Sequence, residues 1–223
     1  ASGSSRSIVL NLHVGSAQRM LHHQDRSLID LELSLFGVFD GVGQFRRSGE
    51  AAQLALETIV EVCRSGAVPP LEALVAGCVR ADTQIAQGGL GATTATLVWI
   101  VGSDILYVSV GDSRLYYQKA DDPAPVQVTV DEGEGNILDN TLGLGSSRGR
   151  DPVAPQHGKL RLEPPAKLLL VTDGVTGDFA PDLLTDVELG LAVSGRDPQR
   201  AAERLVDIAR KRDDRTALVI FAD

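Results

Sequence analysis

Two adjacent helical patterns stand between two groups of β-type runs, and this grouping constrains the fold more than any other feature of the chain. Apolar residues recur with helical spacing over residues 48–65 and again from Pro69-Pro70 to Gly88-Gly89. The β-branched and aromatic runs cover residues 7–14, 27–39, 93–101, 105–110, 115–118, 167–172 and 216–221, and a further helical pattern covers residues 198–212. Strands grouped apart from helices predict an α+β fold with helices packed on antiparallel sheets, and not a doubly wound parallel sheet.

Charge and hydropathy exclude several classes of partner. The 223 residues include 21 Lys and Arg and 30 Asp and Glu, which gives a formal net charge of −9. A chain this acidic repels nucleic acid and anionic lipid. The longest apolar runs, such as Leu168–Val171, are too short to cross a bilayer. We therefore expect no nucleic-acid partner and no membrane insertion.

Cysteine usage and the start of the sequence indicate the compartment and the domain organisation. Cys63 and Cys78 lack CxxC spacing and are expected to be buried free thiols, which suits a reducing compartment. The sequence opens without a charged and then apolar leader, so we expect a cytoplasmic protein. We expect one domain over residues 1–223, with residues 1–6 as a disordered lead-in.

Four aspartates stand beside the ends of predicted strands. Asp40, Asp112 and Asp173 follow apolar runs and adjoin a glycine, and Asp213 precedes the last strand. One aspartate at such a position is typical of a turn, but four at comparable positions predict a shared acidic site at one edge of a sheet. Clustered carboxylates repel one another unless a cation neutralises them, and such oxygen ligands suit Mg²⁺ or Mn²⁺ better than zinc. The pattern alone predicts an acidic metal site and leaves phosphate chemistry open.

Five segments in order resemble the metal-dependent protein serine/threonine phosphatase family, type 2C. They are FGVFDGVG at 36–43, GATTAT at 91–96, LYVSVGDSR at 106–114, LLLVTDGV at 168–175 and RDDRTALV at 212–219. Each string alone is weak evidence, whereas five with family-like spacing indicate membership, and the resemblance runs from about residue 7 to the end. It implies a four-layer α-β-β-α sandwich, in which two antiparallel sheets are flanked by helix pairs and the metals lie at one edge.

The resemblance also implies a role for the strand-end aspartates. Asp40 would bridge two Mn²⁺ or Mg²⁺ ions, and the Gly41 carbonyl would complete the second ion. Asp173 and Asp213 would hold the first ion, so Asp40, Asp173 and Asp213 are the predicted catalytic set. Asp112 resembles an aspartate that helps some members bind a third, weaker metal, although a hairpin turn in which Asp112 pairs with Arg114 explains it equally well.

Two residues near the start of the chain complete the implied site. Asp25 resembles the acidic end of an early family motif and would contact the metals through water. Arg19 resembles an early phosphate-binding arginine, at a spacing one residue longer than usual.

The sequence also departs from the family pattern. Val42 stands where eukaryotic members carry a histidine, which favours the bacterial branch, and Gln24 stands where glutamate is common. Asp178 is interpreted as a shifted substitute for an aspartate expected near position 177. The segment 128–145 is short, so the mobile flap found beside the site in most members is expected to be reduced or lost, as in compact bacterial regulatory phosphatases.

These residues predict hydrolysis of phosphoserine and phosphothreonine in proteins by direct attack of a metal-bound water, with no covalent phosphoenzyme. The implied partners are a phosphorylated protein and a bacterial kinase or regulator. An alternative is a pseudophosphatase that keeps the fold as a regulatory binding module, which the short flap and Gln24 favour. A third interpretation is an enzyme that acts on non-protein phosphoesters.

Overall fold

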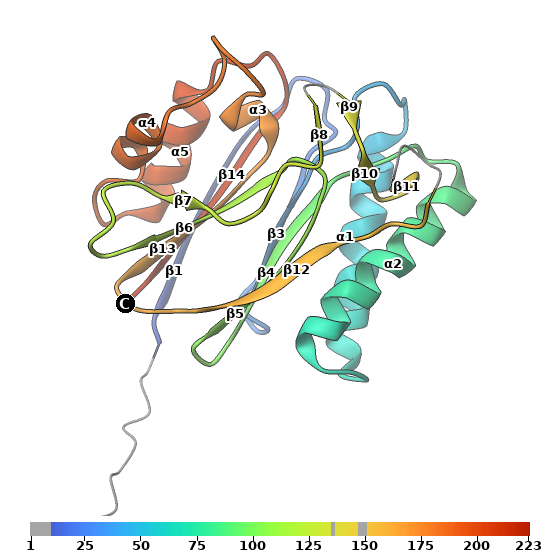
Figure 1. Ribbon diagram of the computed structural model, residues 1–223, viewed down its shortest axis with the longest axis horizontal. Helices are drawn as coiled ribbons and strands as arrows, with labels where there is room; N and C mark the ends of the chain where they lie inside the picture. Colours follow the sequence, from blue (N-terminus) through green and yellow to red (C-terminus); the bar gives the residue numbers. More distant parts are fainter. Residues whose placement is uncertain (1–9, 135–136, 147–150) are drawn as a thin grey trace, which may run out of the picture.

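Two five-stranded antiparallel sheets face each other in the computed structural model, which describes residues 10–134, 137–146 and 151–223 (Figure 1). Sheet one has the order β1 (Leu12–Arg19), β14 (Arg215–Ala222), β13 (Ala166–Val171), β6 (Arg114–Lys119) and β7 (Val126–Gln127). Sheet two has the order β12 (Gln156–Arg161), β5 (Asp104–Val110), β4 (Ala95–Val101), β3 (Leu35–Phe39) and β2 (Arg26–Asp30). The predicted lead-in at residues 1–6 lies outside the described residues, and the single domain over 1–223 stays a prediction.

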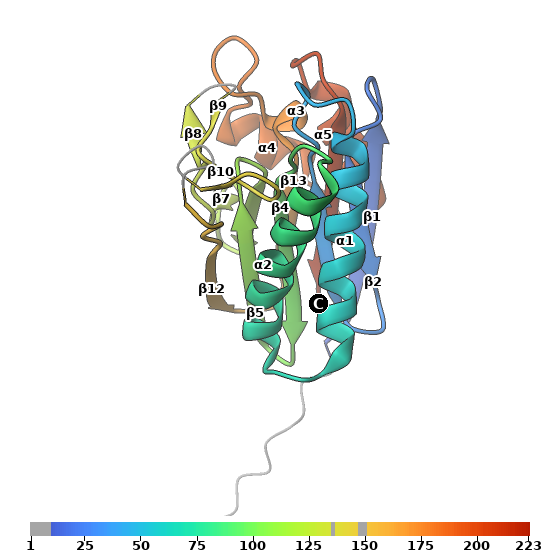
Figure 2. The ribbon, with the colours of Figure 1, turned by 90° about the vertical axis from the view of Figure 1, so that its right-hand side faces the viewer.

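Helices cover the outer face of each sheet, so the α-β-β-α sandwich predicted from the sequence is confirmed (Figures 1 and 2). The long pair α1 (Ser48–Ser65) and α2 (Pro70–Gly88) packs on sheet two. Sheet one is covered by α3 (Asp173–Thr176), α4 (Asp186–Ala192) and α5 (Pro198–Ile208). Within the described part of the chain, every helix is too short or too polar to span a membrane.

Alternation along the strands explains this layering. In β13, Leu168 and Leu170 pack between the two sheets, whereas Leu169 and Val171 point to the helices over sheet one. Successive side chains of a strand point to opposite faces, so a strand buried on both faces reads as a continuous apolar run. The apolar strings at the ends of the family motifs are therefore central strands.

Two boundaries differ from the sequence-based expectation. The first strand was expected at residues 7–14, of which 7–9 lie outside the described residues, but β1 covers Leu12–Arg19 because its whole length pairs with β14. The last helix was expected to run to residue 212, but α5 ends at Ile208. Ala209 leaves the helical conformation, and the following residues turn back to enter β14.

The short segment before β12 forms two small ladders instead of a long flap. The first pairs β8 (Gly133–Glu134) with β9 (Ile137–Leu138), and the second pairs β10 (Asn140–Thr141) with β11 (Gly145–Ser146). The Gly143 backbone N–H donates to Asp82 Oδ1 of α2 at 2.7 Å. This bond ties the second ladder to the helical layer over sheet two.

Candidate metal centre

Strand ends from both sheets bring the predicted aspartates to one cavity of about 440 Å³, called here the acidic pocket. Asp40 follows β3, Asp112 lies between β5 and β6, Asp173 follows β13, and Asp213 precedes β14. All four line this pocket together with Gly41. The convergence expected from the sequence is present, although the strands that carry these residues are up to 173 positions apart in the sequence (40 to 213).

Hydrogen bonds between the Asp40 backbone and Thr93 and Thr94 hold Asp40 in place. Its N–H donates to Thr94 Oγ1 at 3.0 Å, and its carbonyl accepts from the Thr94 N–H at 2.8 Å and from Thr93 Oγ1 at 2.9 Å. Burial raises the pKa of the Asp40 carboxyl well above its ordinary value, and the nearby charges of Asp25 and Asp173 raise it further. Asp40 thus lies where a negative charge is costly unless a cation accompanies it.

Asp25 lies behind the pocket and is completely buried. Its Oδ2 accepts hydrogen bonds from Thr216 Oγ1 at 2.7 Å and from Thr172 Oγ1 at 2.9 Å, while its Oδ1 is buried with no hydrogen-bond partner. Burial is the main cause that raises its pKa to about 7, and the two hydroxyl donors partly oppose this shift. A buried carboxylate oxygen without a donor is the arrangement expected of a group that faces a cation or its water shell.

A second concentration of negative charge lies at Asp112, Asp173 and Asp178. One oxygen from each carboxylate lies within 4.8 Å of the others. Burial raises the pKa of Asp112 and of Asp178, and the charge of Asp173 raises both further. Asp173 Oδ1 is also buried without a hydrogen-bond partner. These oxygen-only donors and their mutual repulsion fit a hard divalent cation.

Lys211 is the residue of the site that the sequence reasoning missed most clearly. Its ammonium contacts Asp173 and lies 3.0 Å from Asp178 Oδ2 and 3.6 Å from Asp213 Oδ2. Burial alone would lower the pKa of Lys211, but the charge of Asp173 and the other carboxylates raises it overall. The chain therefore places a positive charge of its own among these carboxylates. Its place two residues before Asp213 was the available signal.

Asp214, also missed, ties the loop before β2 to the start of β14. Its carboxylate accepts the backbone N–H groups of Leu21, His22, Gln24 and Asp25, at 2.6 Å from the His22 and Gln24 nitrogens and 3.4 Å from Asp25. Burial would raise the pKa of Asp214, but these donors lower it overall. Gly174 allows the close approach on the other side, because a Cβ there would lie 1.8 Å from the Asp214 carbonyl oxygen.

Comparisons with known proteins decide the family. The model of the protein phosphatase 2C family matches residues 16–210. The chain belongs to the protein phosphatase 2C family. No match was found among curated protein sequences.

Solved structures of family phosphatases share the fold along nearly the whole chain. PppA, a regulatory component of the type VI secretion system in Pseudomonas aeruginosa, superposes with a TM-score of 0.79 at 21% identity over 95% of this chain and 98% of its own. MsPP from Mycobacterium smegmatis, in complex with cacodylate, has a TM-score of 0.76 at 24% identity over 95% and 97%. The catalytic domain of PstP, in complex with two manganese ions, has a TM-score of 0.77 at 20% identity over 96% and 99%.

Arg19 and Arg212, the two arginines compared as phosphate contacts, differ in position. Arg19, the predicted phosphate contact, ends β1 and pairs with Asp207 at 2.8 Å, and both side chains are exposed. It is not among the residues that line the acidic pocket, and it would have to leave Asp207 to meet a phosphate. Arg212, which the sequence reasoning did not single out, is exposed and lines the pocket.

Of the positions at which this family member departs from the common pattern, Val42 lies at the acidic pocket and Gln24 is not among its lining residues. The Val42 N–H donates to the Ala92 carbonyl at 3.0 Å. The Gln24 side chain donates to the Phe45 carbonyl at 3.4 Å. Leu138 of β9 also lines the pocket. The small β8–β9 ladder therefore lies beside the pocket, on the side where most family members are expected to carry a longer flap.

Proposed function

We propose that this chain is a metal-dependent phosphatase that hydrolyses phosphoserine and phosphothreonine in proteins. The observation that carries the proposal is the convergence of Asp40, Asp112, Asp173 and Asp213 on one pocket, with two buried carboxylate oxygens left without donors. An acidic, open cavity suits a phosphorylated side chain only when cations balance its charge. Family membership and the fold of the phosphatase relatives point the same way.

In this proposal each acidic residue has a stated task. Asp40 and the Gly41 carbonyl would bind the second of two Mn²⁺ or Mg²⁺ ions, with Asp40 shared between both, and Asp173 and Asp213 would bind the first. Asp112 would contribute to a third, weaker position together with Asp178, whose oxygens lie close to those of Asp112 and Asp173. When bound, such ions supply Lewis-acid activation of water and neutralise phosphoryl oxygens.

The remaining residues orient these ligands and the substrate. The hydroxyls of Thr172 and Thr216 hold Asp25 behind the pocket, where its free Oδ1 would accept a hydrogen bond from an ordered water. Arg212, at the rim of the pocket, would bind the phosphoryl oxygens, because a guanidinium matches their geometry. Leu138 of β9, which lines the pocket, would contact the substrate backbone.

A pseudophosphatase is the second candidate, and Lys211 favours it. The ammonium lies among Asp173, Asp178 and Asp213 and balances part of their charge without a metal. Like charges that are kept together therefore do not by themselves require a catalytic metal site in this chain. Gln24, in place of the more common glutamate, adds to this reading.

One experiment separates the two candidates. Hydrolysis of p-nitrophenyl phosphate and of a phosphothreonine peptide is measured with Mn²⁺, with Mg²⁺, with zinc and after chelation, for the wild type and for Asp173→Asn. We expect turnover with Mn²⁺ or Mg²⁺, none after chelation, and a loss of several orders of magnitude in the variant. A wild type that binds Mn²⁺ and stays silent on peptides and small phosphoesters would support the binding module. Turnover of small phosphoesters alone would support an enzyme with non-protein substrates.

A further inference from the structure

A row of polar and aromatic side chains crosses sheet one at the end opposite to the acidic pocket. Cross-strand pairing places His13 of β1 beside Phe221 of β14, Phe221 beside Lys167 of β13, and Lys167 beside Gln118 of β6. These four residues, called here the polar row, share the face of the sheet that carries the helices. The next row inwards is Gly15, Val219, Leu169 and Tyr116, which α4 and α5 cover.

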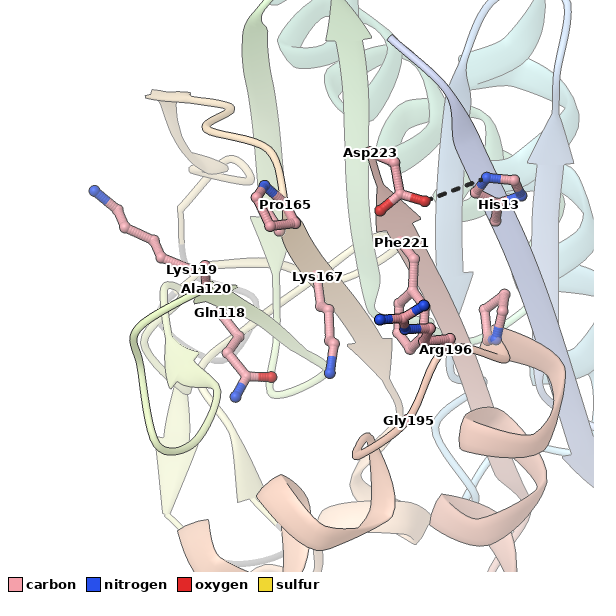
Figure 3. Close-up of a pocket in the computed structure, with 12 residues that line it drawn as sticks. His13, Gln118, Lys119, Ala120, Pro165, Lys167, Gly195, Arg196, Phe221 and Asp223 are labelled. Carbon is pink, nitrogen blue, oxygen red and sulfur yellow. Dashed lines mark ion pairs between the residues drawn. The ribbon is translucent and has the colours of Figure 1, made fainter.

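The polar row forms the floor of a separate cavity of about 570 Å³, called here the far pocket (Figure 3). The loop at Gly195 and Arg196, between α4 and α5, closes one side, and Lys119 and Pro165 stand at the opposite side. This volume is typical of sites for small molecules. The strands β6, β13 and β14 each run from the acidic pocket to the far pocket, a distance of about 20 Å for six residues of strand.

Cationic groups dominate the lining of the far pocket. Lys167 and Arg196 share the lining with one carboxylate, Asp223, on a chain whose net charge is −9, and Lys119 stands at the rim with its ammonium turned away from the cavity (Figure 3). Asp223 Oδ2 already lies 3.5 Å from His13 Nε2, and Lys119 Nζ lies 2.9 Å from Glu163. Arg196 has no carboxylate within ion-pair distance among the described residues. A free guanidinium beside a second cation attracts an anion.

Lys167 and Gln118 give the far pocket fixed polar groups. Lys167 Nζ donates to the Val193 carbonyl at 2.7 Å and lies 5.0 Å from the centre of the Phe221 ring. These two contacts hold the ammonium in place and leave two of its three N–H groups to donate to a ligand. Gln118 is 9% exposed, and its Nε2 donates to the Asp122 carbonyl at 3.0 Å. Its Oε1 is buried without a hydrogen-bond partner and points towards Lys167 across the cavity (Figure 3). A buried acceptor without a donor is unfavourable, and a bound group with a hydroxyl or N–H would supply the missing donor.

We propose that the far pocket binds a small anion that carries a hydroxyl or N–H group close to its charge. The anionic group lies between Lys167 and Arg196, and the neighbouring donor meets Gln118 Oε1. The Phe221 ring and Pro165 contact the carbon skeleton. The anionic group can be a carboxylate or a phosphate, since both accept hydrogen bonds from an ammonium and a guanidinium. The proposal does not depend on catalysis at the acidic pocket.

Matched probes test the need for the anionic group and for the neighbouring donor, and they distinguish a phosphate-type ligand from a carboxylate. 2-Hydroxyethylphosphonate and 3-hydroxypropionate have the same carbon chain and hydroxyl, with a phosphonate that cannot be hydrolysed or a carboxylate. Ethylphosphonate and propionate lack the hydroxyl. Backbone amide shifts in ¹⁵N spectra of the full chain, saturated with Mg²⁺, report where each probe binds. We expect saturable shifts at residues 118–120, 166–167 and 195–196, with a Kd in the region of about 1 mM for one hydroxylated probe and about three- to tenfold weaker binding without the hydroxyl.

Three variants and one control make the result decisive. Arg196→Ala, in an exposed loop, leaves the fold intact and should weaken binding at least about fivefold. Lys167→Met should weaken it further, and Gln118→Leu should remove the preference for the hydroxylated probe while anion binding persists. Lys159→Met removes the same charge from an exposed lysine on sheet two and should change nothing.

Several outcomes would overturn the proposal. They are no saturable shift with any of the four probes, shifts confined to the acidic pocket, and binding that is as strong in Arg196→Ala and Lys167→Met as in the wild type. Binding of the phosphonates alone or of the carboxylates alone supports the proposal and identifies the class of ligand.

Discussion

The two ends of sheet one are built on the same three strands but carry opposite charge. At one end β6, β13 and β14 adjoin Asp112, Asp173 and Asp213, and at the other they end in Gln118, Lys167 and Phe221. Between these ends the strands are largely apolar, and they are covered by helices on one face and by sheet two on the other. The apolar interior of the sandwich thus stabilises the fold and needs only the right hydrophobic pattern. The one or two residues at each end of a strand determine what the chain can bind.

The largest expected effect is a loss of turnover and metal binding at the acidic pocket with no change in ligand binding at the far pocket. Asp40→Ala removes the carboxylate that we propose is shared by two metals, so turnover should fall by several orders of magnitude and both metal-binding phases in a calorimetric titration should disappear. Asp213→Ala should leave one phase partly intact. Binding of the hydroxylated probe at the far pocket should be unchanged in both variants. If Asp40→Ala keeps both phases, the acidic end does not have the proposed arrangement.

Metal removal should destabilise the acidic end, and more so at high pH. The pKa of Asp25 is raised to about 7 in the folded chain from 3.8, so the folded state binds more protons than the unfolded state between about pH 4 and pH 7. Stability of the chelated protein should therefore fall as pH rises through this window, by at most about 4 kcal/mol, and Mn²⁺ should restore it. Thermal melts from pH 4.5 to pH 8 with and without Mn²⁺ measure this. Asp25→Asn should flatten the curve, and an equal slope in that variant would assign the effect to other groups.

A smaller effect tests the positive charge that the acidic end supplies for itself. Lys211→Met removes an ammonium from among Asp173, Asp178 and Asp213, so Mn²⁺ should bind at least about tenfold more tightly, measured by calorimetry. Lys159→Met is the control of equal charge change. Weaker or unchanged Mn²⁺ binding in Lys211→Met would mean that the ammonium and the metal do not compete. Binding of Mn²⁺ by the variant alone would favour the pseudophosphatase.

The smallest effect distinguishes the two arginines. Arg212 lines the acidic pocket, so Arg212→Ala should raise the KM for a phosphothreonine peptide several-fold, by about 1 kcal/mol, with little change in kcat. Arg19→Ala breaks an exposed pair with Asp207 and should change KM less than twofold. The reverse order of effects would restore Arg19 as the phosphate contact expected from the sequence.

The sequence pattern was sufficient to predict helices packed on antiparallel sheets and the acidic residues, for a simple physical reason, whereas the four-layer sandwich was implied by the family resemblance. Long apolar periods determine helices and central strands, and an aspartate next to a glycine at the end of a strand lies at the sheet edge in any antiparallel arrangement. Asp40, Asp112 and Asp173 were found in this way and Asp213 by its place before the last strand, and the structure brings all four together. Their tasks as metal ligands stay predictions.

Other residues could not be found from the sequence because their neighbours are set by tertiary structure. Lys211, Arg212 and Asp214 lie in the turn between α5 and β14, and its course depends on where the helix stops. The sequence predicted that the helix would continue to residue 212, which would have pointed these side chains elsewhere. The polar row likewise depends on the register of four strands, which no local pattern in one strand reveals.

The pairing of β1 with β14 joins residues about two hundred positions apart, and Asp214 also holds the loop at residues 21–25. During synthesis β1 leaves the ribosome about two hundred residues before β14. Sheet one therefore cannot form completely until residues 213–222 have also been made. Contacts of such long range slow folding and leave strand edges exposed in the meantime. A nascent chain that lacks residues 213–222 thus carries Asp25 and Asp40 but cannot bring them together with Asp213, so the acidic pocket is completed only after those residues have been made.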